Sequence, residues 1–328
     1  MLTCRNVVTG AVLMLSLLMP AMAQDAAPRD GANPSQQNER PGRQRRGGRA
    51  ETGDRPMRWQ LGIQTYTFNR FTFVEAVNKA RDLGVRAVEG FAWQKIGGDA
   101  GDTQLNHKAP AEAIAVAQKA LEDAGVRLVS YYVANFGDEE EARKYFQFAR
   151  KMGIRQFVCE PTAEQLDLLD KLAQEYRVRI AIHNHPKDPK KDDYKHWDPD
   201  AVLELIRGRS RMIGCCADTG HWIRSGLDPV ECLKKYEGRL FSLHMKDVKA
   251  KERDAHDVPF GTGVGNVEGQ LKELARQKFS GLIAIEYEHN MEDNQADVKQ
   301  CVEFFRKASA DLGVRAGGGG GRGRQRGN

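Results

Sequence analysis

Long hydrophobic runs are almost absent from this sequence of 328 residues. The apolar stretch at residues 7–19 is shorter than the roughly 20 residues that a membrane-spanning helix needs, so no membrane span is expected. It follows Arg5 and precedes Ala21-Met22-Ala23, an arrangement typical of a secretory signal peptide. We therefore expect a signal peptide at residues 1–23 and export to the periplasm or the medium.

Cysteine is also scarce, and the spacing of the cysteines excludes two common roles. The sequence has six cysteines, and removal of residues 1–23 would leave five. An odd number does not suit a disulfide framework, and no pair has the spacing of zinc ligands. Cys159, Cys215 and Cys216 lie in apolar stretches, where we expect buried thiols.

The body of the chain lacks the excess of positive charge that the net charge of +5 suggests. Arg5, residues 24–58 and residues 316–328 together carry seven net positive charges, which leaves residues 59–315 with two net negative charges. We therefore expect no nucleic-acid partner. Residues 24–57, rich in Arg, Gly, Pro and Gln, and the Gly/Arg-rich residues 316–328 hold too few apolar residues to form a core. Both segments are expected to be disordered.

Strand and helix patterns alternate eight times between these two segments. Several of the predicted helices stop at a glycine, as at Gly84, Gly125 and Gly153. Eight strand–helix units over about 250 residues are typical of an α/β fold, the (β/α)8 TIM barrel. A doubly wound open sheet is the alternative, but no Gly-rich phosphate-binding loop follows the first strand. We expect one barrel domain at residues 58–315.

Side chains that commonly bind metals stand at the ends of the last four predicted strands. Because the carboxyl ends of barrel strands meet at one mouth, these side chains are expected to converge. A set of imidazoles and carboxylates without sulfur suits Mn, Co, Fe, Zn or Mg, and we expect one divalent metal ion. Taken singly, each histidine is better explained as a hydrogen-bonded structural residue. The residues are His183 and His185, Asp218 and His221, His244 and Lys246, and Glu286.

Together these motifs resemble the xylose isomerase-like TIM barrels, a group of sugar isomerases, epimerases and keto-sugar lyases that also includes endonucleases. The resemblance covers about residues 59–313 and is specific as a set of motifs. It implies a single divalent metal held by one residue from each of the last four strands. The motifs are His183-Asn184-His185, Asp218-Thr219-Gly220-His221, Leu243-His244-Met245-Lys246-Asp247 and Glu286, and the implied ligands are His183, Asp218, His244 and Glu286.

Two departures from family patterns narrow the expected activity. The ketose epimerases carry a second acid/base glutamate at the position of His183, so a symmetric two-carboxylate epimerisation is not implied. The endonuclease branch needs histidines on the second and third strands, but Glu89-Gly90 and residues 129–133 contain none. A metal-dependent hydrolase of that branch and a non-catalytic sugar-binding barrel remain as alternatives.

The resemblance implies an enzyme that removes a proton next to a sugar carbonyl and forms a metal-stabilised enediolate. Glu286 is a candidate acid/base as well as a ligand. Lys246 is expected near the metal, with a lowered pKa, as a proton donor to the oxyanion or leaving group. A solvated loop lysine is the alternative for this residue. His185, His221 and Glu160 are candidate proton carriers.

The expected substrate is a small sugar, keto-sugar or glycoside. Trp93, Trp197 and His256 fall after strand ends, where they could line a substrate pocket. Residues 258–266 contain three alternating glycines that could let backbone approach a ligand closely. The sequence leaves open whether the chain forms a homo-oligomer.

Overall fold

The computed structural model describes residues 58–317. The signal peptide expected at 1–23, the linker at 24–57 and residues 318–328 of the expected tail lie outside the described residues. Those three expectations therefore remain predictions.

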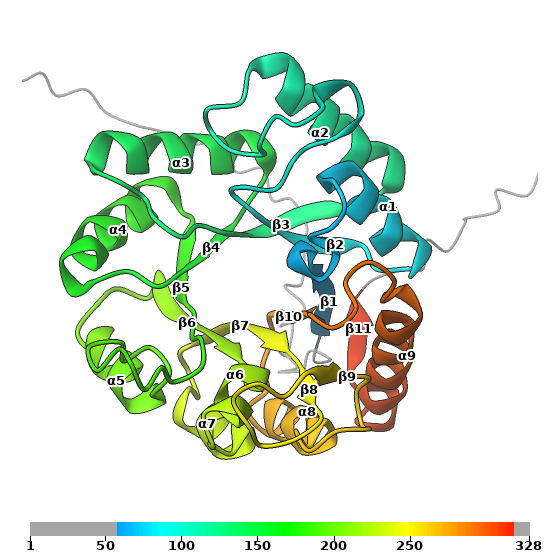
Figure 1. Ribbon diagram of the computed structural model, residues 1–328. Helices are drawn as coiled ribbons and strands as arrows, with labels where there is room; N and C mark the ends of the chain where they lie inside the picture. The colour runs from blue at the N-terminus through cyan, green and yellow to red at the C-terminus, as the bar shows by residue number, and fades with distance from the viewer. Residues whose placement is uncertain (1–57, 318–328) are drawn as a thin grey trace, which may run out of the picture. The chain divides into compact units, whose positions relative to one another are not determined.

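Eight parallel strands close into a barrel around which the helices are arranged (Figure 1). The last barrel strand pairs with the first, with Gly62 opposite Ala284, and this pairing closes the ring. The prediction of a (β/α)8 barrel is thereby confirmed. The strands are β1 (Arg58–Gln64), β2 (Ala87–Phe91), β3 (Arg127–Tyr132), β4 (Gln156–Cys159), β5 (Arg179–Ile182), β6 (Ile213–Asp218), β7 (Leu240–Met245) and β10 (Leu282–Ile285).

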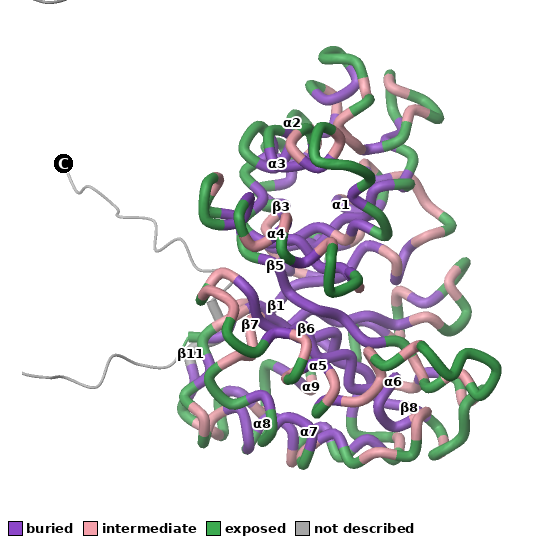
Figure 2. The backbone as a smooth tube through the Cα atoms, turned by 90° about the vertical axis from the view of Figure 1, so that its left-hand side faces the viewer, coloured by how far each residue is buried: buried purple, intermediate pink, exposed green. Residues whose placement is uncertain are grey.

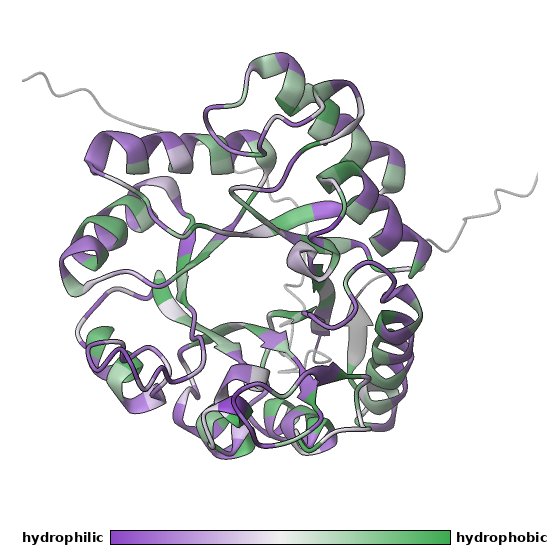
Figure 3. Cartoon of the chain, in the orientation of Figure 1, coloured by the Kyte–Doolittle hydropathy of each residue, from purple (hydrophilic) through white to green (hydrophobic). Residues whose placement is uncertain are grey.

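Figure 3 shows hydrophilic and hydrophobic residues mixed along the helices, and the buried ones are mainly apolar, such as Ala76, Val77 and Ala80 of α1. Thr72 and Thr162 begin α1 and α4 with reciprocal capping boxes, which satisfy backbone N–H groups of the first turn. None of the described helices is long and apolar enough to cross a membrane. The helices are α1 (Phe73–Asp82), α2 (Ala111–Ala124), α3 (Glu139–Met152), α4 (Ala163–Tyr176), α5 (Pro199–Leu205), α6 (Thr219–Arg224), α7 (Pro229–Lys235), α8 (Val267–Arg276) and α9 (Gln295–Asp311), with short 3-10 helices η1 (Thr65–Phe68) and η2 (Gly98–Ala100).

Several short elements were not expected from the sequence. Helix α6 begins at the residue after β6, and a small antiparallel pair, β8 (Asp247–Val248) and β9 (Asp257–Val258), follows β7. Strand β11 (Arg315–Gly317) pairs with the start of β1, so the ordered chain extends two residues into the segment assigned to the tail. Figure 2 shows β11 at one end of the barrel and β8 with α6 at the other.

Small side chains fill the inside of the barrel and leave room for larger polar groups at its carboxyl end. Ala181, Cys216 and Ala284 are completely buried, and each precedes by two residues a side chain of the candidate site. Residues two apart on a strand face the same side, so alternation directs the polar groups into the mouth. All five cysteines of the described chain are buried free thiols, as predicted for Cys159, Cys215 and Cys216.

Candidate metal centre

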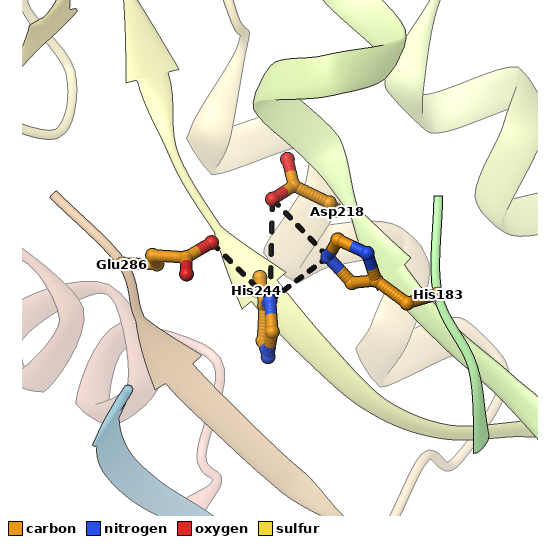
Figure 4. A group of neighbouring side chains, drawn as sticks. All are labelled: His183, Asp218, His244 and Glu286. Atoms are coloured by element: carbon orange, nitrogen blue, oxygen red, sulfur yellow. Dashed lines mark hydrogen bonds and ion pairs between the residues drawn. The ribbon is translucent and has the colours of Figure 1, made fainter. Parts of the chain in front are cut away.

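Four polar side chains converge at the carboxyl ends of neighbouring strands (Figure 4). His183 follows β5, Asp218 ends β6, His244 lies in β7 and Glu286 follows β10. One nitrogen or oxygen of each lies within 4.8 Å of the others, and all four residues are buried. The structure thus brings together the four ligands that the sequence implied.

Hydrogen bonds to carboxylates orient both imidazoles. His244 Nε2 lies 2.7 Å from Glu89 Oε1, and His183 Nδ1 lies 2.8 Å from Glu160 Oε1. An N–H at each of these positions donates to the carboxylate, so the second nitrogen of a neutral ring carries a lone pair. These second nitrogens, His244 Nδ1 and His183 Nε2, face each other at 3.1 Å.

The two carboxylates complete a set of donors that fits a cation. Asp218 Oδ2 is buried without a hydrogen-bond partner, and it lies 3.7 Å from His183 Nε2 and 4.0 Å from His244 Nδ1. Glu286 Oε2 lies 3.2 Å from His244 Nδ1. Burial alone lowers the pKa of His183, but Asp218 and Glu160 outweigh it and raise that pKa to about 10. The centre therefore favours positive charge, and a divalent ion could replace the protons of the imidazoles.

Lys246 is buried beside this centre, so the alternative of a solvated lysine is wrong. Its Nζ lies 3.1 Å from Asp218 Oδ2 and 2.8 Å from Glu286 Oε2, and it also pairs with Glu288. Burial lowers the pKa of Lys246, but these carboxylates outweigh burial and raise it well above the usual value. The lowered pKa expected from the sequence is corrected accordingly, because that expectation did not include three carboxylates around one ammonium group.

Glu160 forms hydrogen bonds to two of the histidines and to a tyrosine. One of its oxygens accepts hydrogen bonds from His183 Nδ1 and from His185 Nδ1, and the other accepts from the Tyr194 hydroxyl at 3.0 Å. Burial raises the pKa of Glu160, but His183 and His185 lower it far more. The carboxylate is thus held ionised and positions His183 and His185, and the predicted role of Glu160 as a proton carrier stays a prediction.

His221 has the environment of a neutral imidazole. Asp218 Oδ1 accepts a hydrogen bond from its backbone N–H, and Arg224 donates to Nδ1 at 3.4 Å. Burial, Lys246 and His185 hold its pKa well below the usual value, although Asp218 opposes them. The ring stacks on that of the half-exposed His185 with the centroids 5.1 Å apart. Two of the predicted proton carriers, His185 and His221, therefore lie together at the edge of the metal centre.

A cavity of about 200 Å³ is lined by three of the four residues, His183, His244 and Glu286. Trp93 lines it together with His185 and His221, as the sequence predicted for a substrate pocket. Trp197 and His256 do not line it: Trp197 packs under the Lys187 ammonium group at 4.7 Å, and His256 lies against His289. The remaining lining side chains are Gln64, Tyr66, Phe91, Tyr132, Ala134 and Glu288.

The glycine-rich loop after β9 encloses a carboxylate of the chain instead of lining this cavity. The backbone N–H groups of Gly261, Gly263 and Gly265 donate to Asp247 at 2.8–3.0 Å. A Cβ atom at Gly263 would lie 2.4 Å from Asp247 Oδ1 and 2.3 Å from the Val248 carbonyl oxygen. The glycines expected to approach a ligand thus allow the backbone to approach Asp247.

Two carboxylates of the site, Glu89 and Glu288, were not among the site residues predicted from the sequence. Glu89, on β2, is completely buried and accepts hydrogen bonds from His244 and from Gln64 Nε2 at 2.9 Å. Glu288 lines the cavity and pairs with Lys246. Its position two residues after Glu286 is the signal that could have revealed it, whereas nothing in the sequence pairs Glu89 with His244, 155 residues away.

Comparison with known proteins identifies the family to which this fold belongs. The model of the xylose isomerase-like TIM barrel family matches residues 77–308. The chain belongs to this family. Its relatives include an inosose dehydratase of Clostridium botulinum (strain Alaska E43 / Type E3), 24% identical over 238 residues, which are 57% of this chain and 78% of the relative.

Other relatives match over a smaller part of their length. The rhizopine catabolism protein MocC of Rhizobium meliloti is 27% identical over 63% of this chain and 65% of its own. An inosose dehydratase of Clostridium botulinum (strain Eklund 17B / Type B) is 28% identical over 39% of this chain and 46% of its own. Against several of its relatives the chain therefore matches about half of the relative's length.

Solved structures show the same fold over most of the chain. A protein of unassigned function from Parabacteroides distasonis is 35% identical, with a TM-score of 0.62 over 76% of this chain and 99% of that one. A D-tagatose 3-epimerase-like protein reaches 0.61 at 16% identity over 77% and 98%. The IOLI protein, whose structure holds a zinc atom, reaches 0.54 at 15% identity over 77% and 97%. The relatives with assigned activities are sugar-modifying enzymes.

Proposed function

We propose that this chain is a divalent-metal-dependent enzyme that removes a proton next to the carbonyl of a keto-sugar and expels the substituent at the next carbon. The observation that carries the proposal is the convergence of two imidazole nitrogens and two carboxylate oxygens beside a cavity. Asp218 Oδ2, which has no hydrogen-bond partner of its own, lies 3.7 Å from His183 Nε2 and 4.0 Å from His244 Nδ1, and Lys246 Nζ lies beside it at 3.1 Å. The relatives named inosose dehydratases support an elimination reaction.

Acid and base groups of the chain stand at the edge of the ligand set. A divalent ion held by His183, Asp218, His244 and Glu286 would supply Lewis-acid stabilisation of the developing oxyanion. His221, neutral at pH 7, is the group we assign to accept the proton from carbon. Lys246, held as an ammonium ion, is assigned to donate a proton to the leaving oxygen, which departs as water or an alcohol.

The elimination outcome is favoured over epimerisation by the groups present. Epimerisation through two opposed carboxylates needs a second glutamate where His183 stands, and the nearby Glu160 is occupied by hydrogen bonds to His183, His185 and Tyr194. Loss of the substituent from the carbanion-like intermediate needs only one base and one acid. His221 and Lys246 provide that pair.

Product analysis tests this proposal. Metal-stripped protein, with and without added Mn²⁺ or Co²⁺, is incubated with a keto-inositol, a 3-keto-glucoside and a ketohexose. The expected result is metal-dependent loss of water or of the aglycone, detected by mass spectrometry. Stereoisomers without elimination would favour the epimerase. Stoichiometric metal binding without any reaction would favour a hydrolase, and failure to bind metal would favour a non-catalytic sugar-binding barrel.

We further propose that the enzyme is exported. Support comes from the sequence of residues 1–23, with Arg5, an apolar run and Ala21-Met22-Ala23 before the proposed cleavage point. Expression of the full chain in a bacterium, followed by fractionation and intact mass measurement, is expected to yield a periplasmic protein that begins at Gln24. A cytoplasmic protein with an uncleaved N-terminus would contradict export.

A further inference from the structure

Arginines surround the mouth of the barrel opposite the metal centre. Arg58, Arg127 and Arg179 are the first residues of β1, β3 and β5. Arg155 immediately precedes β4, and Arg177 directly follows α4, two residues before β5. All five are exposed and line one cavity of about 870 Å³ at the amino ends of the strands. We call these five residues the arginine rim.

The cavity combines this positive rim with a floor that carries no negative charge. None of its lining residues is acidic, and the floor includes Val129, Met212 and Leu282. Its volume lies within the range of about 300–1,000 Å³ that is common for small-molecule sites. A concave surface lined by charge of one sign concentrates its field and attracts oppositely charged ligands.

Within residues 58–317, no side chain of the arginine rim forms an ion pair, whereas many other arginines do. Arg143 pairs with Glu139 and Glu175, and Arg276 pairs with Glu237 and Glu273. In the rim, Arg179 instead stacks over the Phe241 ring at 4.9 Å, which restricts its guanidinium group without neutralising it. The net negative charge of residues 59–315 was the reason to expect no polyanion-binding surface. That sum includes acidic residues outside this cavity, so it did not reveal the local excess of positive charge at the rim.

Arg177 gives a second, independent indication that the rim has a role. Helices α2 and α3 end in Gly125 and Gly153 with φ values of 60° and 75°. Helix α4 ends in the same left-handed conformation, with φ of 57°, but the residue there is Arg177. A side chain with a Cβ atom is strained in this conformation, whereas glycine is not. The chain thus holds a guanidinium group at the rim where glycine would stabilise the fold.

We propose that the arginine rim is a binding site for a small anion with several phosphate or carboxylate groups. Planar guanidinium groups bind both kinds of oxyanion through paired hydrogen bonds. The site lies at the end of the barrel remote from the metal centre, and it does not depend on the activity proposed above.

Calorimetric titration of the full chain with inorganic tripolyphosphate and, separately, with citrate tests the proposal and distinguishes phosphate from carboxylate ligands. The variant Arg127→Gln/Arg155→Gln/Arg179→Gln removes three rim charges. A control variant, Arg81→Gln/Arg150→Gln/Arg207→Gln, removes the same charge from exposed positions on α1, on α3 and in the turn after α5. Wild type and control are expected to bind one equivalent of at least one probe, and the rim variant about 100-fold more weakly or worse.

The single variant Arg177→Gly separates binding from folding. It is expected to raise the midpoint of thermal unfolding, because the strain is relieved, and to weaken binding about 10-fold. A fold defect would lower both quantities, so the opposite signs identify a binding residue.

Two results would overturn the proposal. One is the absence of binding of both probes to the wild-type chain at low salt. The other is equal loss of affinity in the rim and control variants, or no loss in either, which would assign the binding to net charge or to the arginines in residues 24–57 and 316–328.

Discussion

The charged side chains at one mouth of the barrel are paired within the protein, whereas those at the other mouth are not. At the carboxyl end, Lys246 and the carboxylates Asp218, Glu286 and Glu288 are packed against one another in a largely buried cluster. At the amino end, the arginine rim is exposed and has no acidic partner among residues 58–317. Buried charges must be compensated within the protein, whereas exposed charges are compensated by solvent.

Whether the charges are paired within the protein determines which kind of ligand each mouth suits. In the metal centre, hydrogen bonds and ion pairs within the protein hold the two imidazoles, Asp218 and Glu286 in a fixed arrangement. The arginine rim offers many donors and no fixed geometry for a single ion. The first arrangement suits one small cation at defined ligands, and the second suits a larger anion.

The largest effect is expected from Asp218→Asn. Replacement of one carboxylate oxygen by an amide NH₂ group removes a ligand and places N–H donors against the imidazoles. Metal analysis is expected to show loss of stoichiometric metal, and turnover is expected to fall by about 10³-fold or more, since Lewis-acid catalysis contributes several kcal/mol. Asp311→Asn, at an exposed position, is the control. Full metal content in Asp218→Asn would contradict the assigned ligand set.

Replacement of the proposed base, His221→Gln, is expected to leave metal content unchanged and lower kcat by about 10²–10⁴-fold, the usual contribution of a general base. Steady-state kinetics with metal analysis on the same sample measures both quantities. A variant with wild-type kcat would exclude His221 as the base and transfer that role to another group of the cavity.

A smaller effect is expected from Glu89→Gln, which changes a residue that contacts His244 but lies behind the ligands. Loss of the charge weakens the hydrogen bond that orients the imidazole, and metal affinity is expected to fall about 10- to 100-fold. Competition with a chelator measures this change. Unchanged affinity would show that packing alone orients His244.

Stability, more than catalysis, is expected to change in Asp247→Asn. The carboxylate accepts four backbone N–H groups, and an amide can accept only at its single oxygen. The free energy of unfolding is expected to decrease by about 3 kcal/mol in a denaturant titration, because buried donors lose their acceptors. A loss of turnover without a change in stability would instead place the glycine-rich loop in the reaction.

The smallest effect on turnover is expected from the variant Arg127→Gln/Arg155→Gln/Arg179→Gln. Its side chains lie at the opposite end of the barrel from the metal centre, so kcat is expected to stay within about twofold of wild type when assayed without polyanions. A large decrease would show that the two mouths are coupled.

The sequence was sufficient to predict the fold and the convergence of four polar side chains, because both depend on local patterns. Strand periodicity and helix stops predicted the barrel, and alternation within four strands aligned His183, Asp218, His244 and Glu286. Contacts between distant segments were not predictable. The bond from His244 to Glu89, the three carboxylates around Lys246 and the wrapping of the glycines around Asp247 all depend on how strands and loops meet in space.

Exchange of hydrogen for deuterium next to the carbonyl of a keto-inositol, followed by proton NMR in D₂O, tests the central claim most directly. The account predicts exchange by the Mn²⁺-loaded wild-type protein, none by the metal-stripped protein, and none by Asp218→Asn in the same buffer. Exchange that proceeds at the same rate without metal, or in Asp218→Asn, would contradict a metal centre built from these four residues.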